Sequence, residues 1–162
     1  HDPLRRQRQM CIRDRYTGLI AATFPEAKIL HVKRNAAAVC WANYKQWFRS
    51  NELGYSYSID DIVEYHRLYE DLMKFWNKIF NNKIYEVDYE ALTIDHENEI
   101  KKLINHLDLR WEEKCLFPEK NKRSISTASN IQIREKIYKG SSQQWKKYKP
   151  FLSGALDYLD NH

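Results

Sequence analysis

The chain has few cysteines, glycines and prolines, and it lacks a long apolar run. Its 162 residues include three cysteines, four glycines and four prolines. No cysteine stands in a Cys-x-x-Cys or Cys/His ligand spacing, so the sequence indicates neither a disulfide framework nor a metal site. We interpret Cys40 and Cys115 as buried thiols. No apolar run approaches the roughly 20 residues of a membrane span. The compartment stays open, with the cytoplasm favoured.

The chain carries little excess charge once its first fifteen residues are set aside. Its formal net charge is +5, but residues 1–15 hold five arginines and two aspartates, which leaves about +2 for the remainder. That balance is not typical of a protein that binds nucleic acid. From Arg5 to Arg15 the residues match what one reading frame of a sequencing-library transposon adaptor would encode. We therefore expect residues 1–15 to be a non-native leader, the alternative being a disordered basic arm.

The remaining pattern predicts an α/β fold in which helices dominate. Short β-rich runs predict strands at residues 28–32 and 83–87. Capping residues and apolar periodicity predict helices at residues 36–49, 60–80, 96–107, 111–117 and 141–149. In the helix over 60–80, one face is expected to pack into the core or to stack on a ligand, and it consists of Ile62, Tyr65, Tyr69, Leu72, Trp76 and Ile79. Residues 50–56 and 119–140 are expected to be loops.

Two basic turns have the composition of phosphate sites. Arg34 follows the first strand and precedes a helix capped by Asn35, the position at which open α/β sheets and helix N-termini bind anions. Lys139 and Gly140 precede two serines and Trp145 at the start of another helix. The alternative for Arg34 is a surface ion pair with Asp60 or Asp61. Further basic residues of the last third are either a solvated surface or a binding face: Lys114, Lys120, Lys122, Arg123, Arg134, Lys136, Lys146, Lys147 and Lys149.

Taken in order, these segments resemble the C-terminal half of a sulfotransferase domain that uses 3′-phosphoadenosine 5′-phosphosulfate. The match runs from about Phe24 to about Leu152 and is closest to the tyrosylprotein sulfotransferases and the bacterial proteins similar to them. The segments that carry the resemblance are the strand that ends before Arg34, the helix with many aromatic residues at 60–80, Val87-Asp-Tyr-Glu-Ala-Leu92, and the basic loop that reaches Lys139-Gly140 and Trp145. The resemblance implies a P-loop-type three-layer domain in residues 16–162, truncated at the N-terminus.

The resemblance also implies which residues hold the nucleotide. The matching positions are Arg34, Tyr89, Ser129, Gln132, Ile133, Arg134, Lys139 and Gly140. Arg34 would bind the 3′-phosphate, Tyr89 the adenine end, and residues 129–138 would close over the nucleotide; a core role for Tyr89 is the alternative. The chain departs from the family at Ala42, where a serine shares the 3′-phosphate, at Ala36 and Ala38, and at Gln144.

Two parts of the family's active site have no match here. The sequence has no Gly-Thr-Thr or Gly-x-x-x-x-Gly-Lys-Ser run that could hold the phosphosulfate. The catalytic base is also expected upstream, and we read His31, His66, His96 and His106 as structural or exposed. We therefore expect this fragment to be inactive alone.

The function implied is transfer of a sulfuryl group to an acceptor hydroxyl without a metal. The acceptor could be a protein tyrosine in an acidic peptide, a sugar hydroxyl or a small phenol. Two other hypotheses for the function remain open. A P-loop nucleotide kinase fragment would need Mg²⁺ ligands and an arginine-rich lid, and a non-catalytic basic module would bind acidic peptides through residues 114–149.

Overall fold

The computed structural model describes residues 15–48, 51–80, 83–120 and 139–160. In these residues, β1 (Ile29–Lys33) and β2 (Ile84–Asp88) form a parallel pair. Ile29 lies opposite Ile84, and Lys33 lies opposite Asp88. Parallel neighbours need a crossover connection, and the long helix α4 (Ile59–Ile79) supplies it. Both predicted strands are confirmed, each shifted by one residue, and the mixed α/β class is confirmed with them.

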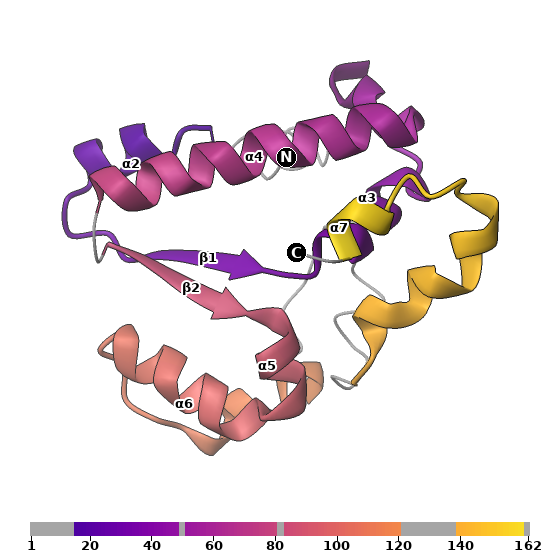
Figure 1. The fold of residues 1–162 in the computed structure, drawn as a ribbon. Helices are drawn as coiled ribbons and strands as arrows, with labels where there is room; N and C mark the ends of the chain where they lie inside the picture. Colours follow the sequence, from indigo (N-terminus) through magenta and orange to yellow (C-terminus); the bar gives the residue numbers. More distant parts are fainter. Residues whose placement is uncertain (1–14, 49–50, 81–82, 121–138, 161–162) are drawn as a thin grey trace.

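Helices lie on both sides of the strand pair. His31 of β1 is hydrogen-bonded to Tyr69 of α4, whereas Tyr85 of β2 stacks on His106 of α6 (His96–His106) with 4.3 Å between ring centroids. Because side chains alternate along a strand, these two contacts use opposite faces. Figure 1 shows the result, with α4 on one side of the arrows and α5 (Tyr89–Ile94) and α6 on the other.

The helices begin at the capping residues that the sequence offers. Ala38 N donates to Asn35 Oδ1 over 2.9 Å at the start of α3 (Ala36–Tyr44). Asp61 N donates to Ser58 Oγ over 3.3 Å at the start of α4. Each bond satisfies a backbone donor that the first helical turn leaves without a partner. The end of α3 at Tyr44 is earlier than predicted, and residues 51–56 of the loop predicted at 50–56 belong to the 3-10 helix η1 (Asn51–Tyr57).

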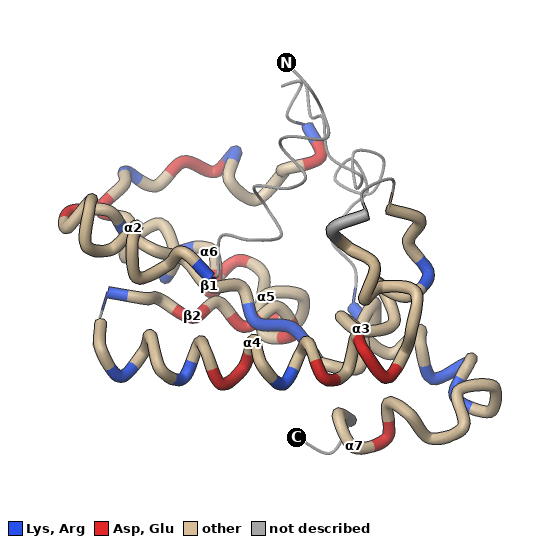
Figure 2. The backbone as a smooth tube through the Cα atoms, turned by 90° about the horizontal axis from the view of Figure 1, so that it is seen from above, with Lys and Arg blue, Asp and Glu red and all other residues tan. Residues whose placement is uncertain are grey.

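The predicted inner face of α4 is largely confirmed. Ile62 is buried and Tyr65, Tyr69, Leu72 and Trp76 are half-buried, whereas Ile79 is 52% exposed. The structure adds His66 and Met73 to the buried side chains of this helix. The imidazole of His66 occupies a core position, which a count of apolar residues cannot reveal. Charged positions recur along α4 in Figure 2, with Asp60 and Asp61 in its first turn and Lys78 in its last.

The main core lies where α3 meets α4 and the C-terminal elements. It contains small residues of α3 together with larger side chains from other elements: Ala37, Ala38, Cys40, Ile62, Trp145, Leu156 and Leu159. Trp145 lies in the 3-10 helix η5 (Ser141–Phe151), and Leu159 lies in α7 (Asp157–Asp160). The alanines let η5 approach α3 closely, so the second basic turn is held near the end of β1. The predicted helix at 141–149 is therefore present as a 3-10 helix.

The remaining elements are short. A helix that the sequence did not predict, α2 (Thr17–Thr23), precedes β1, and the predicted helix over 111–117 is replaced by η2 (Glu113–Leu116) and η3 (Pro118–Lys120). The strands keep some apolar side chains in contact with solvent, since Leu30 is 37% and Val32 58% exposed. Within the described ranges, no helix is both long enough and apolar enough to span a bilayer.

Candidate functional site

Arg34 connects the end of β1 to the second basic turn. Its Nε donates a hydrogen bond of 2.9 Å to Ser142 Oγ, and its guanidinium carbon lies 4.8 Å from the centroid of the Tyr89 ring. Neither partner is one of the two aspartates at the start of α4. The contact through Nε leaves the guanidinium's two terminal nitrogens as the pair whose geometry suits a phosphate. Two of the residues predicted to bind nucleotide, Arg34 and Tyr89, therefore lie together.

The turn before η5 takes the shape that its glycine permits. Gly140 has φ 85°, in the left-handed region that side chains disfavour, and it immediately precedes the first residue of η5. Next to it, the Oγ of Ser141 lies 3.2 Å from the Tyr89 hydroxyl, while Ser142 is only 3% exposed. Ser141 thus connects the turn to Tyr89, and Ser142 connects it to Arg34. The sequence had placed these hydroxyls in the turn but had not assigned them to particular partners.

A carboxylate also lies at this site. Asn35 N donates to Glu90 Oε1 over 3.3 Å, at the N-terminus of α3. The start of a helix carries a partial positive charge, which a nearby carboxylate stabilises. The carboxylate of Glu90 therefore offsets part of the positive charge at the N-terminus of α3 that would attract an incoming anion. Sequence reasoning missed Glu90, because its contact depends on how α5 sits beside β1.

The other predicted nucleotide-binding residues have different outcomes. Lys139 has an exposed side chain in the turn before Gly140, and its role in binding remains a prediction. Ser129, Gln132, Ile133 and Arg134 lie outside the described residues. Ala42, where the family has a serine, is half-buried on α3.

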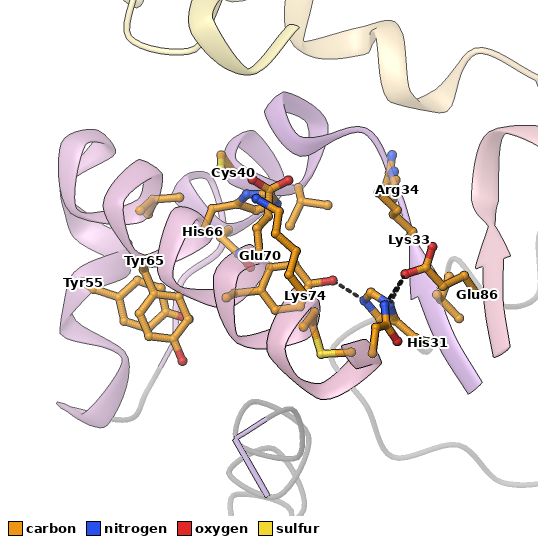
Figure 3. A pocket seen from close by; sticks show the side chains of 17 residues that line it. His31, Lys33, Arg34, Cys40, Tyr55, Tyr65, His66, Glu70, Lys74 and Glu86 are labelled. Carbon is orange, nitrogen blue, oxygen red and sulfur yellow. Dashed lines mark hydrogen bonds and ion pairs between the residues drawn. The ribbon is translucent and has the colours of Figure 1, made fainter. Parts of the chain in front are cut away.

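A cavity of about 270 Å³ opens beside Arg34, between β1, α3 and α4 (Figure 3). Its wall is mixed. Apolar parts come from Val32, Val39, Ile62 and Met73, and aromatic rings come from Tyr55, Tyr65 and Tyr69. Its polar groups are those of Lys33, Lys74, Glu70, Glu86, Asn43, Asn77, His31 and His66. Arg34 also lines the cavity, so the cavity lies directly beside the site formed by Arg34, Tyr89 and Ser142.

Three side chains from three elements form a chain along one side of this cavity. His31 of β1 is hydrogen-bonded through Nε2 to the Tyr69 hydroxyl, and its Nδ1 lies 3.6 Å from Glu86 Oε1. His31 and Glu86 are also register partners across the two strands. In Figure 3 a dashed line joins His31 to Glu86. This arrangement could not be predicted from the sequence, because it depends on the strand register and on the rotation of α4.

Burial changes the acidity of two further groups at the cavity. It raises the pKa of the Cys40 thiol to about 12, and the charge of Glu70 acts in the same direction. Burial lowers the pKa of His66 below its ordinary value, with Glu70 opposing that effect. Both shifts follow from the cost of placing a charge away from water. Cys40 is therefore a neutral thiol in the folded protein.

Across the described ranges, no three His, Cys, Asp or Glu side chains gather closely enough to hold a metal ion.

Comparison with known proteins gives two matches. The sequence model described as "Sulfotransferase family" matches residues 14–113, which include β1, Arg34, α4 and Tyr89. An uncharacterized protein of Aquifex aeolicus (strain VF5) is 36% identical over 146 residues. That alignment covers 89% of this chain and 19% of the relative, so the chain spans about a fifth of the relative's length.

Proposed function

Because this chain belongs to the sulfotransferase family, we propose that it contributes the 3′-phosphate half of the donor site in a 3′-phosphoadenosine 5′-phosphosulfate-dependent enzyme. Residues 16–162 would form the C-terminal part of a P-loop-type three-layer domain. The rest of that domain would supply the loop that holds the phosphosulfate and the base that accepts the acceptor's proton. The observation that supports this proposal best is the contact of Arg34 with Ser142 and Tyr89.

The group of residues around Arg34 suits a phosphate on a nucleoside. The guanidinium can bind two phosphate oxygens at once, and the Tyr89 ring offers an apolar surface next to it. By the resemblance, residues 129–138 and the Lys139-Gly140 turn would also address the 3′-phosphate and the adenine. The hydroxyl that the family has at position 42 is absent, and Ser142 supplies a hydroxyl from η5 at the Arg34 Nε.

The proposed reaction is an in-line transfer. The acceptor oxygen attacks sulfur and forms a new S–O bond, while the bond from sulfur to the bridging phosphate oxygen breaks. The acceptor proton passes to the base, and the nucleotide leaves as adenosine 3′,5′-bisphosphate. Negative charge grows on the bridging oxygen, so positioning and nearby positive charge carry the catalysis. In this chain, Arg34 would anchor the far end of the nucleotide and thereby orient its reactive end.

The acceptor has a hydroxyl, and the resemblance admits a protein tyrosine, a sugar or a small phenol. This chain alone is expected to bind the product nucleotide weakly and to transfer no sulfuryl group. Loss of a single preorganised donor typically lowers an enzyme's rate on the order of 100- to 1000-fold. The phosphosulfate loop and the base would both lie outside this chain.

Titration with two nucleotides tests the proposal. Residues 1–162 should bind adenosine 3′,5′-bisphosphate more tightly than adenosine 5′-monophosphate, which lacks the 3′-phosphate. Equal affinities would exclude Arg34 as a 3′-phosphate ligand. Binding that requires Mg²⁺ would favour a nucleotide kinase fragment, and binding of acidic peptides that the nucleotide cannot displace would favour a peptide-binding module.

A further inference from the structure

The cavity beside Arg34 has the chemistry of a site for one sugar ring. Its polar groups include carboxylates that only accept hydrogen bonds, ammonium groups that only donate them, and amides and tyrosine hydroxyls that do both. Aromatic and aliphatic side chains lie among them. A sugar ring carries several hydroxyls, each a donor and an acceptor, on a ring with apolar C–H faces. The hydrogen-bonding and apolar groups of the cavity therefore complement those of a sugar ring.

The size of the cavity also limits what it can hold. Its volume of about 270 Å³ is just below the range of roughly 300–1,000 Å³ that holds drug-sized ligands. One ring with its substituents therefore fits better than an extended chain. Tyr55 and Tyr65 stack on each other, with centroids 4.1 Å apart and planes 8° from parallel. Their mutual stacking holds the wall of the cavity in a fixed position before a ligand arrives.

The same groups disfavour the other two acceptor classes. A phenol brings one hydroxyl, so most of the polar groups around it would lose water without gaining a hydrogen bond. An acidic peptide would bring carboxylates toward Glu70 and Glu86, and like charges repel. With Arg34 bound to the nucleotide phosphate, Lys33 and Lys74 balance these two carboxylates, which favours an uncharged ligand.

We propose that this cavity binds a neutral hexose or N-acetylhexosamine ring and presents it as the acceptor beside the nucleotide. The proposal rests on the proposed function, because it names the acceptor of that reaction. Arg34 forms part of both sites, so a ring in the cavity lies next to the bound nucleotide. Tyr69, which is hydrogen-bonded to His31, and Glu86, whose Oε1 lies 3.6 Å from His31 Nδ1, would orient ring hydroxyls along the β1 side.

Ligand-observed saturation-transfer NMR on residues 1–162 tests this directly. The probes are the methyl glycosides of glucose, galactose and N-acetylglucosamine, with N-acetyltyrosinamide as the phenolic comparison. At least one glycoside should bind, with the tyrosine derivative weaker. Binding of the tyrosine derivative alone, or of none of the glycosides, would overturn the proposal.

Matched variants on α4 locate the binding. Glu70→Gln and Lys74→Ala should weaken glycoside binding by about 3- to 10-fold, the effect of one hydrogen bond. Lys74 has a side chain that is 75% exposed, so its removal does not threaten folding. Glu64→Gln and Lys78→Ala change exposed residues on the same helix and should have no effect. Equal effects of cavity and control variants would overturn the cavity as the site.

The nucleotide titration keeps the two proposals separate. If binding that depends on the 3′-phosphate persists while no glycoside binds, the sugar proposal is wrong and the sulfotransferase site stands. If glycosides bind at the cavity while the two nucleotides bind equally, the proposed donor site is wrong.

Discussion

Arg34 at the end of β1 and Ser142 in the first turn of η5 are joined by a hydrogen bond of 2.9 Å although 108 positions separate them in the chain. The bond fixes the guanidinium at Nε and holds η5 against the strand end. Two turns that looked alike in the sequence therefore become one site.

Arg34→Lys should weaken binding of adenosine 3′,5′-bisphosphate by about 10- to 100-fold. Lysine keeps the charge but loses the planar fork and the bond to Ser142, and a hydrogen bond to a charged group contributes about 1.5–3 kcal/mol. Isothermal titration calorimetry measures the change. Arg110→Lys, at an exposed position, is the matched control. Unchanged affinity for the bisphosphate would remove Arg34 from the site.

Ser142→Ala should lower the free energy of unfolding by about 0.5–1.5 kcal/mol, the net contribution of one hydrogen bond. It should also weaken nucleotide binding, since the guanidinium would no longer be held at Nε. Urea denaturation and nucleotide titration measure the two effects. Ser141→Ala removes the neighbouring hydroxyl, which lies by Tyr89 and not by Arg34. If the two variants bound nucleotide equally, orientation of Arg34 by Ser142 would not matter.

Gly18→Ala should destabilise the protein by about 1–3 kcal/mol, the usual cost of overpacking. A Cβ at Gly18 would lie 2.3 Å from the Trp76 ring, closer than atoms can approach. Trp76→Phe removes the atoms that clash, so the same glycine substitution should cost less in that background. Thermal unfolding of the four proteins gives the coupling. Gly54→Ala is the control, because nothing lies within 4 Å of its added Cβ.

The stability of the protein should fall as the pH is lowered from 7 through 6.5 because of His66. Burial lowers the pKa of His66 in the folded state, whereas the unfolded chain has a value of about 6.5. Below that pH the unfolded state binds a proton that the folded state refuses, so acid favours unfolding. His66→Phe should flatten this part of the curve of unfolding free energy against pH. A curve of the same slope in both proteins would contradict the assignment.

Cys40 should resist alkylation until the protein unfolds. With its pKa raised to about 12, its thiolate fraction at pH 8 is on the order of 1000-fold below that of an ordinary thiol. Its side chain is also fully buried, whereas Cys115 is partly exposed. Mass spectrometry after iodoacetamide treatment of a Cys11→Ser protein should find Cys115 modified first. Rapid modification of Cys40 in the folded protein would disprove its burial.

Local patterns in the sequence predicted most of the backbone. Asn35 and the β-rich run before it fixed the turn at Arg34, because a capped helix start and a short strand each depend on neighbouring residues. The loop predicted at residues 50–56 was wrong for residues 51–56, because turn-forming residues are also compatible with the 3-10 helix that is observed there. The exact face of α4 depended on tertiary contacts with β1 and α3, which periodicity does not specify.

Only part of the candidate site could be predicted from the sequence, because its remaining contacts depend on tertiary structure. The resemblance assigned Arg34 and Tyr89 to different ends of one nucleotide, and the structure brings the two side chains together. The partner of Arg34 in η5 and the contact of Glu90 with Asn35 depend on distances between elements that are far apart in the chain. The cavity was not predicted at all, because its polar residues come from two strands and two helices and form no local motif.

The exposed side chains of the strand pair bear on how the isolated chain behaves at high concentration. A strand at the edge of a sheet presents backbone N–H and C=O groups that another chain can pair with. Within the described residues the sheet has two strands, and Val32 on β1 is 58% exposed. Copies of the chain can therefore add to each other strand by strand. We therefore expect the polypeptide to aggregate increasingly as its concentration rises. The substitution Val32→Lys should suppress this aggregation.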